Sequence, residues 1–444
     1  MDILRGLIAS GIVKFAIPIA ISAVLQQLLN ASDIIIVGQF AGTEALAAVG
    51  ANTFVITLMV NLFMGLSIGA NVVIARMIGA GDDSGASRAA HSTVALALLC
   101  GLLLAGVGVT AAESILRMLQ TPVDILADAA LYFRIIFLSM PFQLLYNFSA
   151  AILRSRGDTK RPLYVLAGCS VLNVLLNLLL TAWLGWGVRG VAIATAISIT
   201  VGSFIMLRLL MRETGVLRID LRRIRVHLPS AGMIARIGIP AGLQGVVFSF
   251  SNVILQGAIN TIGTDAVASA AAALNFENLC YFVVVAFGQA GTSFLSQNYG
   301  AQQWERCRSV VKHTILLGAG AEILVTLICI VWRHPLSSWF VDSPAVAELI
   351  ALRMLIVLPL AFVNGIDDII SNMMRAIGHP LLPSLISVTG ICGVRLLWIF
   401  LAFPLVHDYG FLLYCYPLSW SATALVMMPT FAVIARRKLR RPAA

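Results

Sequence analysis

Acidic and basic side chains inside long apolar segments are the residues of this sequence best placed to do chemistry. A charged group at bilayer depth costs at least about 2.5 kcal/mol on insertion scales, so each one is a candidate site. The acids of this kind are Asp33, Glu277, Glu322, Asp367 and Asp368, and the bases are Arg134, Arg353 and Arg395. Buried carboxyl groups of this type can bind and release a proton or a cation.

Asp33 ends a polar stretch near the C-terminal end of the first apolar segment. Gln26, Asn30 and Asp33 are spaced at i, i+4 and i+7, which places them on one face of a helix. A row of amides that ends in a carboxylate suits a protonatable or Na⁺-binding site. The alternative is an interfacial aspartate that is wetted at the helix end.

Glu277 lies near the middle of another apolar segment, between Asn275 and Asn278. At that depth a lone glutamate is expected to be largely protonated unless a partner or an ion compensates its charge. It is therefore a candidate proton carrier or counter-charge for a cationic substrate. The structural alternative is a buried ion pair between Glu277 and an arginine.

Asp367 and Asp368 are adjacent, so their side chains point about 100° apart on a helix. We expect only one of them to face a given cavity, with Asp368 as the functional member. The other is expected to pair with an arginine such as Arg395. Glu322 has no polar neighbours on its own helix face, and we expect it to be structural.

The segments that carry these residues are membrane spans. Hydrophobic residues make up 59% of the 444 residues and charged residues only 11%, against about 25% charged in soluble domains. Apolar runs of about 20 residues, enough to cross a bilayer, follow one another along the chain. They predict an all-α membrane protein with twelve spans, at about 11–37, 49–76, 89–112, 126–150, 163–184, 189–211, 231–256, 267–295, 309–331, 347–373, 382–403 and 409–435.

Lysine and arginine concentrate in alternate loops, which predicts the orientation by the positive-inside rule. With both termini in the cytoplasm, the inside loops hold most of the basic residues, and the outside loops hold few. The inside residues are Arg76, Arg88, Arg154, Arg156, Lys160, Arg161, the stretch from Arg212 to Arg236, Arg306, Arg308, Lys312, Arg375 and the run from Arg436 to Arg441. We expect an integral protein of the bacterial inner membrane, and no nucleic-acid partner despite the formal charge of +10.

The two halves of the chain repeat one another at an offset of about 221 residues. Ile17-Pro18 recurs as Ile239-Pro240, and Gly79-Ala80 as Gly300-Ala301. An even number of spans in each repeat predicts two six-helix lobes related by a pseudo-twofold axis along the membrane normal. The predicted lobes are residues 1–211 and 231–444, joined by a cytoplasmic linker at 212–230. Such an arrangement fits transport by alternating access.

Several motifs resemble those of the multidrug and toxic compound extrusion (MATE) transporters over nearly the whole chain. They are Asn30-Ala31-Ser32-Asp33 with Val37-Gly38, Gly42-Thr43-Glu44-Ala45-Leu46-Ala47-Ala48, Gln297-Asn298-Tyr299-Gly300-Ala301 and Arg375-Ala376-Ile377-Gly378. The resemblance implies a V-shaped, two-lobe fold. It also implies export of cationic, amphipathic small molecules or drugs by an antiporter that H⁺ or Na⁺ drives.

The resemblance carries residues over only in part. Asp33 matches the family's cation-coupling aspartate and Asn173 the asparagine of its fifth helix, but Asn177 stands where an aspartate is usual. Phe248 and Asn364 replace two acids of the Na⁺-coupled branch, so coupling by H⁺ is slightly favoured. The expected coupling acids are Asp33, Glu277, Asp367 and Asp368, and the expected lining residues are Gln26, Asn30, Asn173, Asn177, Gln244, Asn275, Asn278 and Asn364.

Two other functions fit the sequence less well. A lipid-linked oligosaccharide flippase of the same superfamily would line its cavity with arginine and lysine, whereas here the embedded acids at least match the bases. A membrane-embedded transferase would need a catalytic motif, and the six histidines have no such spacing. We therefore expect a monomeric transporter without enzymatic activity, with a small-molecule substrate, the lipid bilayer as its surroundings, and no metal or cofactor beyond the coupling ion.

Overall fold

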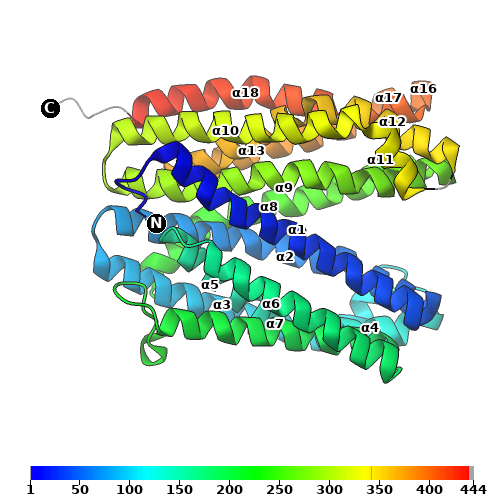
Figure 1. The fold of residues 1–444 in the computed structure, drawn as a ribbon, viewed down its shortest axis with the longest axis horizontal. Coiled ribbons are helices and arrows are strands. Elements are labelled where there is room, and N and C mark those ends of the chain that lie inside the picture. The colour runs from blue at the N-terminus through cyan, green and yellow to red at the C-terminus, as the bar shows by residue number, and fades with distance from the viewer. Residues whose placement is uncertain (1, 342, 440–444) are drawn as a thin grey trace. The chain divides into compact units, whose positions relative to one another are not determined.

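The computed structural model describes residues 2–341 and 343–439, and nearly all of them are helical (Figure 1). Helices suit this apolar chain because a lipid environment requires every backbone polar group to be bonded internally. The main helices are α1 (Ile8–Phe40), α2 (Gly42–Gly79), α3 (Asp83–Met118), α4 (Val123–Leu138), α5 (Met140–Ser155), α6 (Lys160–Asn177), α7 (Gly187–Met211), α8 (Leu228–Asn260), α9 (Thr264–Gly300), α10 (Trp304–Val331), α11 (Arg333–Phe340), α12 (Pro344–Val357), α13 (Ala361–Ala376), α14 (Leu381–Ser387), α15 (Val394–Leu397), α16 (Phe403–Val406), α17 (Tyr409–Leu413) and α18 (Cys415–Lys438).

Twelve membrane spans can be drawn through the described residues, as the sequence predicts. Eleven are helical segments long and apolar enough to cross a bilayer, and the twelfth is the pair α4 and α5, bent by 43°. The bend falls at Ser139, just before Pro141. Proline has no backbone N–H group and therefore cannot continue the hydrogen bonds of a helix. Pro359 interrupts the span of α12 and α13 in the same way, within the short 3₁₀ turn η3 (Leu358–Leu360).

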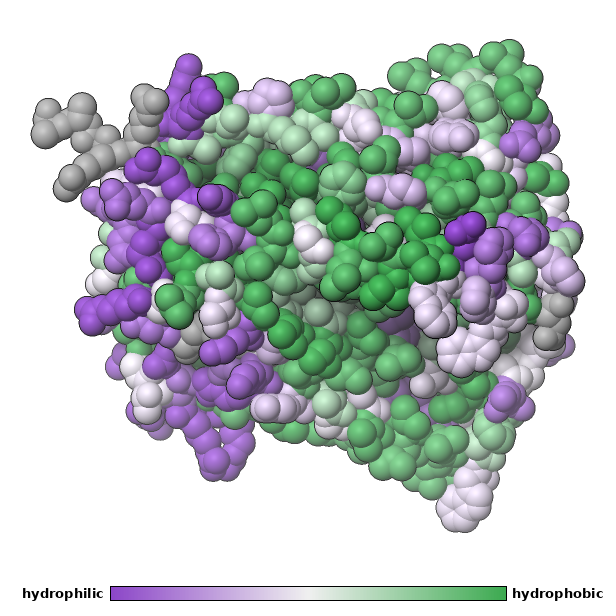
Figure 2. All heavy atoms as spheres, turned by 45° about the horizontal axis from the view of Figure 1, so that its top comes forward, coloured by the Kyte–Doolittle hydropathy of each residue, from purple (hydrophilic) through white to green (hydrophobic). Residues whose placement is uncertain are grey.

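On the face that Figure 2 shows, apolar side chains cover the middle, while hydrophilic ones gather toward the ends, most densely at one of them. Leucines such as Leu102, Leu324 and Leu327 are exposed on helix faces that a soluble protein would bury. A patch of this extent is typical of a surface that contacts lipid. The chain is therefore an integral membrane protein.

The helices form two compact units, each with its own core. The N-terminal unit comprises Ile21–Gly238, and the C-terminal unit comprises the chain up to Ala20 together with the chain from Ile239 onward. The sequence predicts lobes at 1–211 and 231–444. In the structure, the start of α1, up to Ala20, belongs to the C-terminal unit, and the start of α8, up to Gly238, belongs to the N-terminal unit. Both boundaries lie beside a proline inside a helix, Pro18 in α1 and Pro240 in α8.

The short segments are held by specific contacts. In the C-terminal unit, Arg306 donates hydrogen bonds to the carbonyl oxygens of Ile3 (3.2 Å) and Gly6 (2.9 Å). In the N-terminal unit, α8 approaches α2 so closely that a Cβ atom on Gly69 would lie 2.4 Å from the carbonyl oxygen of Ile234. Small residues that allow such backbone contact commonly stabilise helix pairs in membranes.

Replacing Gly69 by alanine should therefore destabilise the N-terminal unit. The added methyl group has no space, and overpacking of this kind costs about 1–3 kcal/mol. We expect the Gly69→Ala variant to melt at a lower temperature than the wild type in detergent. Gly168→Ala is the control, because no atom lies within 4 Å of a Cβ atom there. Equal melting temperatures for both variants would contradict the close packing.

The segment predicted as a linker lies on the N-terminal unit. The backbone N–H of Asp220 donates to Nε2 of His91 on α3 (3.1 Å), and that of His227 donates to the hydroxyl of Ser92 (2.8 Å). Glu213 forms ion pairs with Arg156 in the loop after α5 and with Arg161 at the start of α6. The two last arginines of the predicted basic run, Arg440 and Arg441, lie outside the described residues.

Candidate functional site

The N-terminal unit contains a small cavity of about 80 Å³ beside Asp33. Gln26, Asn30 and Asp33 all line it, as their shared helix face predicts. The opposite wall comes from α5, α6 and α7 and includes Asn173, whereas Asn177 reaches the site through a hydrogen bond. The cavity is thus formed by polar groups from several helices around one carboxyl group.

Neutral side chains hold the carboxyl group of Asp33. The amide of Asn177 donates to its Oδ1 (2.5 Å), and the hydroxyl of Thr195 donates to its Oδ2 (3.4 Å). Asn173 supports both donors: its amide donates to the Thr195 hydroxyl (3.2 Å), and its oxygen accepts from Asn177 (3.2 Å). No lysine, arginine or histidine of the described chain forms an ion pair with Asp33. Its charge is therefore left for a proton or a bound cation to balance.

Asn177 directly precedes a π-helical turn, η1 (Leu178–Trp183). Such turns shift the register of side chains and occur frequently at functional sites. Thr195 and the π turn are the features of this site that the sequence did not predict. Thr195 is one of several hydroxyl residues on α7, so its residue type alone did not single it out.

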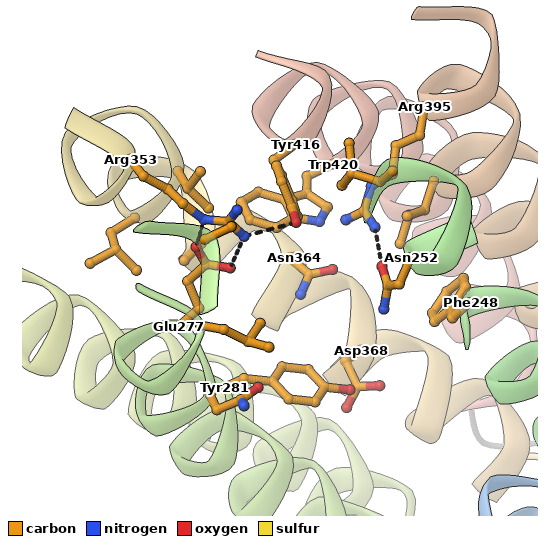
Figure 3. Close-up of a pocket in the computed structure, with 18 of the residues that line it drawn as sticks. Phe248, Asn252, Glu277, Tyr281, Arg353, Asn364, Asp368, Arg395, Tyr416 and Trp420 are labelled. Atoms are coloured by element: carbon orange, nitrogen blue, oxygen red, sulfur yellow. Dashed lines mark hydrogen bonds and ion pairs between the residues drawn. The ribbon is translucent and has the colours of Figure 1, made fainter. Parts of the chain in front are cut away.

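The C-terminal unit contains a larger cavity of about 340 Å³ (Figure 3). Its walls come from α8, α9, α10, α12, α13, α15 and α18, and they mix acids, arginines, amides and aromatic rings. The polar and aromatic lining residues are Gln244, Phe248, Asn252, Gln256, Glu277, Asn278, Tyr281, Glu322, Arg353, Asn364, Asp367, Asp368, Ser387, Arg395, Tyr416 and Trp420. This volume is in the range of small-molecule binding pockets, about 300–1,000 Å³.

Glu277 is not a lone carboxylate, because Arg353 on α12 compensates it. Nε of Arg353 lies 2.6 Å from Oε1 of Glu277, and its NH2 group lies 3.1 Å from Oε2. The same NH2 group donates to the hydroxyl of Tyr416 (3.0 Å). The structure thus has the buried ion pair that the sequence left open as the structural alternative, and the expectation of an uncompensated glutamate is corrected.

Both aspartates of the adjacent pair line the cavity, which corrects the expectation that only one could. Side chains 100° apart on α13 can both reach a cavity of this width. The carboxylate of Asp368 accepts a hydrogen bond from Asn372 (3.0 Å), which in turn accepts one from Arg375 (3.0 Å). Arg375 also donates to Gln244 (2.6 Å), so Asp368 is linked to a buried cation through a neutral amide.

Among the four acids that line this cavity, Asp367 and Glu322 are the two without compensation. Asp367 is 2% exposed and Glu322 1% exposed. Among the described residues, neither oxygen of Asp367, nor Oε2 of Glu322, has a hydrogen-bond partner. Glu322 was expected to be structural because its own helix face is apolar. It lines the same cavity as Asp367 and Asp368 of α13, which no pattern within α10 could reveal.

Arg395 does not pair with either aspartate, contrary to expectation. Its NH1 group donates to Oδ1 of Asn252 on α8 (3.1 Å), and its guanidinium carbon lies 4.5 Å from the centre of the Tyr416 ring. Asn275 does not line the cavity, because it is two residues from Glu277 and faces away from it. Its amide donates to carbonyl groups of its own helix.

The fold and the two cavities define a class: an integral membrane protein of two helical units, each with polar groups buried at membrane depth. Comparison with known proteins identifies it further. The sequence profile of the MatE family matches residues 18–179 and again residues 240–401, one match in each half. The chain therefore belongs to the MatE family of multidrug efflux transporters.

Relatives with assigned names agree with this family. The chain is 28% identical to the "Probable multidrug resistance protein YoeA" of Bacillus subtilis, over 88% of this chain and 86% of that protein. It is 27% identical to the "Probable multidrug resistance protein NorM" of Thermotoga maritima, over 87% and 83%. A solved structure described as an outward-facing multidrug resistance MATE family transporter has the same fold, with a TM-score of 0.91, 24% identity and 98% of each chain covered.

Proposed function

We propose that this protein is an antiporter that exports cationic or amphipathic small molecules across the inner membrane, with H⁺ or Na⁺ as the coupling ion and Asp33 as its binding residue. Asp33 carries the proposal, because it is an acid in a membrane span that only neutral groups surround. A carboxylate in this position has to bind a proton or a cation to be stable at depth. Alternating occupancy of such a group is what ion coupling requires.

A proton is slightly favoured as the coupling ion, because Phe248 and Asn364 stand where the Na⁺-coupled branch of the family has acids. Asn177 and Thr195 each donate to one carboxylate oxygen of Asp33, and the remaining lone pairs of these oxygens can take up either a proton or a cation. In this proposal both termini are cytoplasmic and the protein works as a monomer. The clustering of arginine and lysine in alternate loops supports that orientation.

Charge in the larger cavity supports export of compounds that carry a positive charge rather than transfer of a pyrophosphate-linked lipid. Four acids line the cavity against two arginines, and one of the arginines is paired with Glu277. A site for pyrophosphate would need an excess of basic residues. The names of the two multidrug resistance relatives also support efflux of small molecules.

The proposal is tested with the purified protein in lipid vesicles. We expect a pH gradient to drive movement of a cationic fluorescent dye faster than in protein-free vesicles, and a collapsed gradient to stop it. A matched Na⁺ gradient at constant pH tests the other ion. If neither gradient moves the dye and fluorescent lipids are scrambled between leaflets instead, the protein is a flippase and the proposal fails.

A further inference from the structure

The cavity of the C-terminal unit combines an uncompensated base with uncompensated acids. Arg353 and Glu277 neutralise each other, and Asp368 is linked to Arg375 through Asn372. Arg395, Asp367 and Glu322 remain. The cavity therefore has a basic pole and an acidic pole that do not bind each other.

The basic pole is buried and only partly satisfied. Arg395 is 7% exposed, and one of its NH groups donates to Asn252. Its Nε has no partner among the described residues, and no carboxylate of the described chain forms an ion pair with it. A cation–π contact with the Tyr416 ring, 4.5 Å from the guanidinium carbon to the ring centre, also holds the Arg395 side chain. A guanidinium group held in this way can donate two parallel hydrogen bonds to the two oxygens of a carboxylate.

The acidic pole comes from Asp367 and Glu322, with Asp368 beside them. Asp367 has two oxygens without partners and Glu322 has one, all buried within the part of the chain that the structure describes. Buried acceptors of this kind cost free energy unless a donor reaches them. An ammonium group supplies three donors and a positive charge. In Figure 3, Arg395 and Asp368 lie on opposite sides of Asn364.

We propose that this cavity binds a zwitterionic small molecule, whose carboxylate contacts Arg395 and whose ammonium group contacts Asp367 and Glu322. Phe248, Tyr281 and Trp420 also line the cavity, so an aromatic body between the two charges fits it. This inference rests on the proposed transport function and narrows its substrate class. A purely cationic compound leaves Arg395 unpaired, and an anionic one leaves Asp367 unpaired.

Three matched probes test the charge requirement by calorimetry on the protein in lipid nanodiscs. They are the dipeptide phenylalanylglycine, its methyl ester, which is a cation, and its N-acetyl derivative, which is an anion. We expect the zwitterion to bind at least about tenfold more tightly than either derivative, since each lost charged hydrogen bond is worth about a factor of ten or more. Equal or tighter binding of the ester, or no binding by any probe, would overturn the proposal.

Single variants test the basic pole and the acidic pole separately. Arg395→Gln should remove the preference for the zwitterion over the ester, and Asp367→Asn the preference over the N-acetyl form. Arg395→Lys keeps the charge and should retain part of the preference if Arg395→Gln folds poorly. Arg134→Gln, an exposed arginine of α4, is the control and should bind all probes as the wild type does. Equal loss for all three probes in each variant would show a structural role and contradict the assignment.

The same measurements separate this inference from the proposed transport function. Asp128→Asn should bind the zwitterion with unchanged affinity, because Asp128 is exposed and lines neither cavity. Binding without gradient-driven movement in the wild type would retain the site and reject the antiporter. Movement of the cationic dye without preference for the zwitterion would retain the antiporter and reject the site.

Discussion

The Asp33→Asn variant is expected to show no gradient-driven transport. The dye should enter its vesicles only as fast as it enters protein-free vesicles. Asparagine has nearly the same shape as aspartate, but it cannot exchange a proton or offer a negative charge to a cation. The cavity and its neutral donors should stay in place, so that expression and melting temperature change little. Only the step in which an ion binds is removed.

The measurement is the initial rate of dye movement under a pH gradient and, separately, under a Na⁺ gradient. Asp128→Asn is a matched control, because Asp128 is an exposed aspartate of the same unit. It should transport as the wild type does. Transport by Asp33→Asn at the wild-type rate under either gradient would show that the coupling ion binds elsewhere, with Asp367 and Asp368 as the next candidates.

The Glu277→Gln variant is expected to lose stability strongly, by about 3–5 kcal/mol, because it leaves a buried guanidinium without its counter-charge. The Arg353 side chain is only 2% exposed, and that of Glu277 13%. The expected readout is a markedly lower melting temperature in detergent. The double variant Glu277→Gln with Arg353→Gln should recover much of the loss, since no unpaired charge remains.

An exposed ion pair provides the comparison. Glu113 and Arg117 on α3 lie 2.7 Å apart, with side chains 49% and 65% exposed. Such pairs contribute about 0–1 kcal/mol, so Glu113→Gln should hardly change the melting temperature. If Glu277→Gln were equally mild, the glutamate would be available for ion binding, as the sequence alone suggested.

Asp33 and Glu277 show which features of the two sites could be predicted from the sequence and which could not. Gln26, Asn30 and Asp33 belong to one helix, and their spacing alone placed them on one face, which lines a cavity. The compensation of Glu277 depends on Arg353, 76 residues further along the chain. Periodicity within a helix cannot identify such a partner, because packing between helices brings it into place.

For Asp367 and Glu322 as well, the surroundings depend on packing between helices and could not be predicted from the sequence. The angle between adjacent residues correctly separates Asp367 from Asp368 on α13, yet it says nothing about the width of the space that they face. Glu322 lies on a helix face that is apolar in the sequence, and packing against α13 makes it part of the polar cavity. Conversely, Asn275 is a polar residue close to Glu277 in the sequence, but it does not line the cavity.

By itself the sequence determined the membrane class, the twelve spans, the repeat and the candidate acids, since these follow from hydropathy, proline positions and periodicity along the chain. The tertiary structure decided which charges are compensated. It pairs Glu277 with Arg353, links Asp368 to Arg375 through Asn372, and leaves Asp33 among neutral donors. The physical reason is that the free energy of a buried charge depends on groups within a few ångströms, and here those groups come from helices far away in the chain.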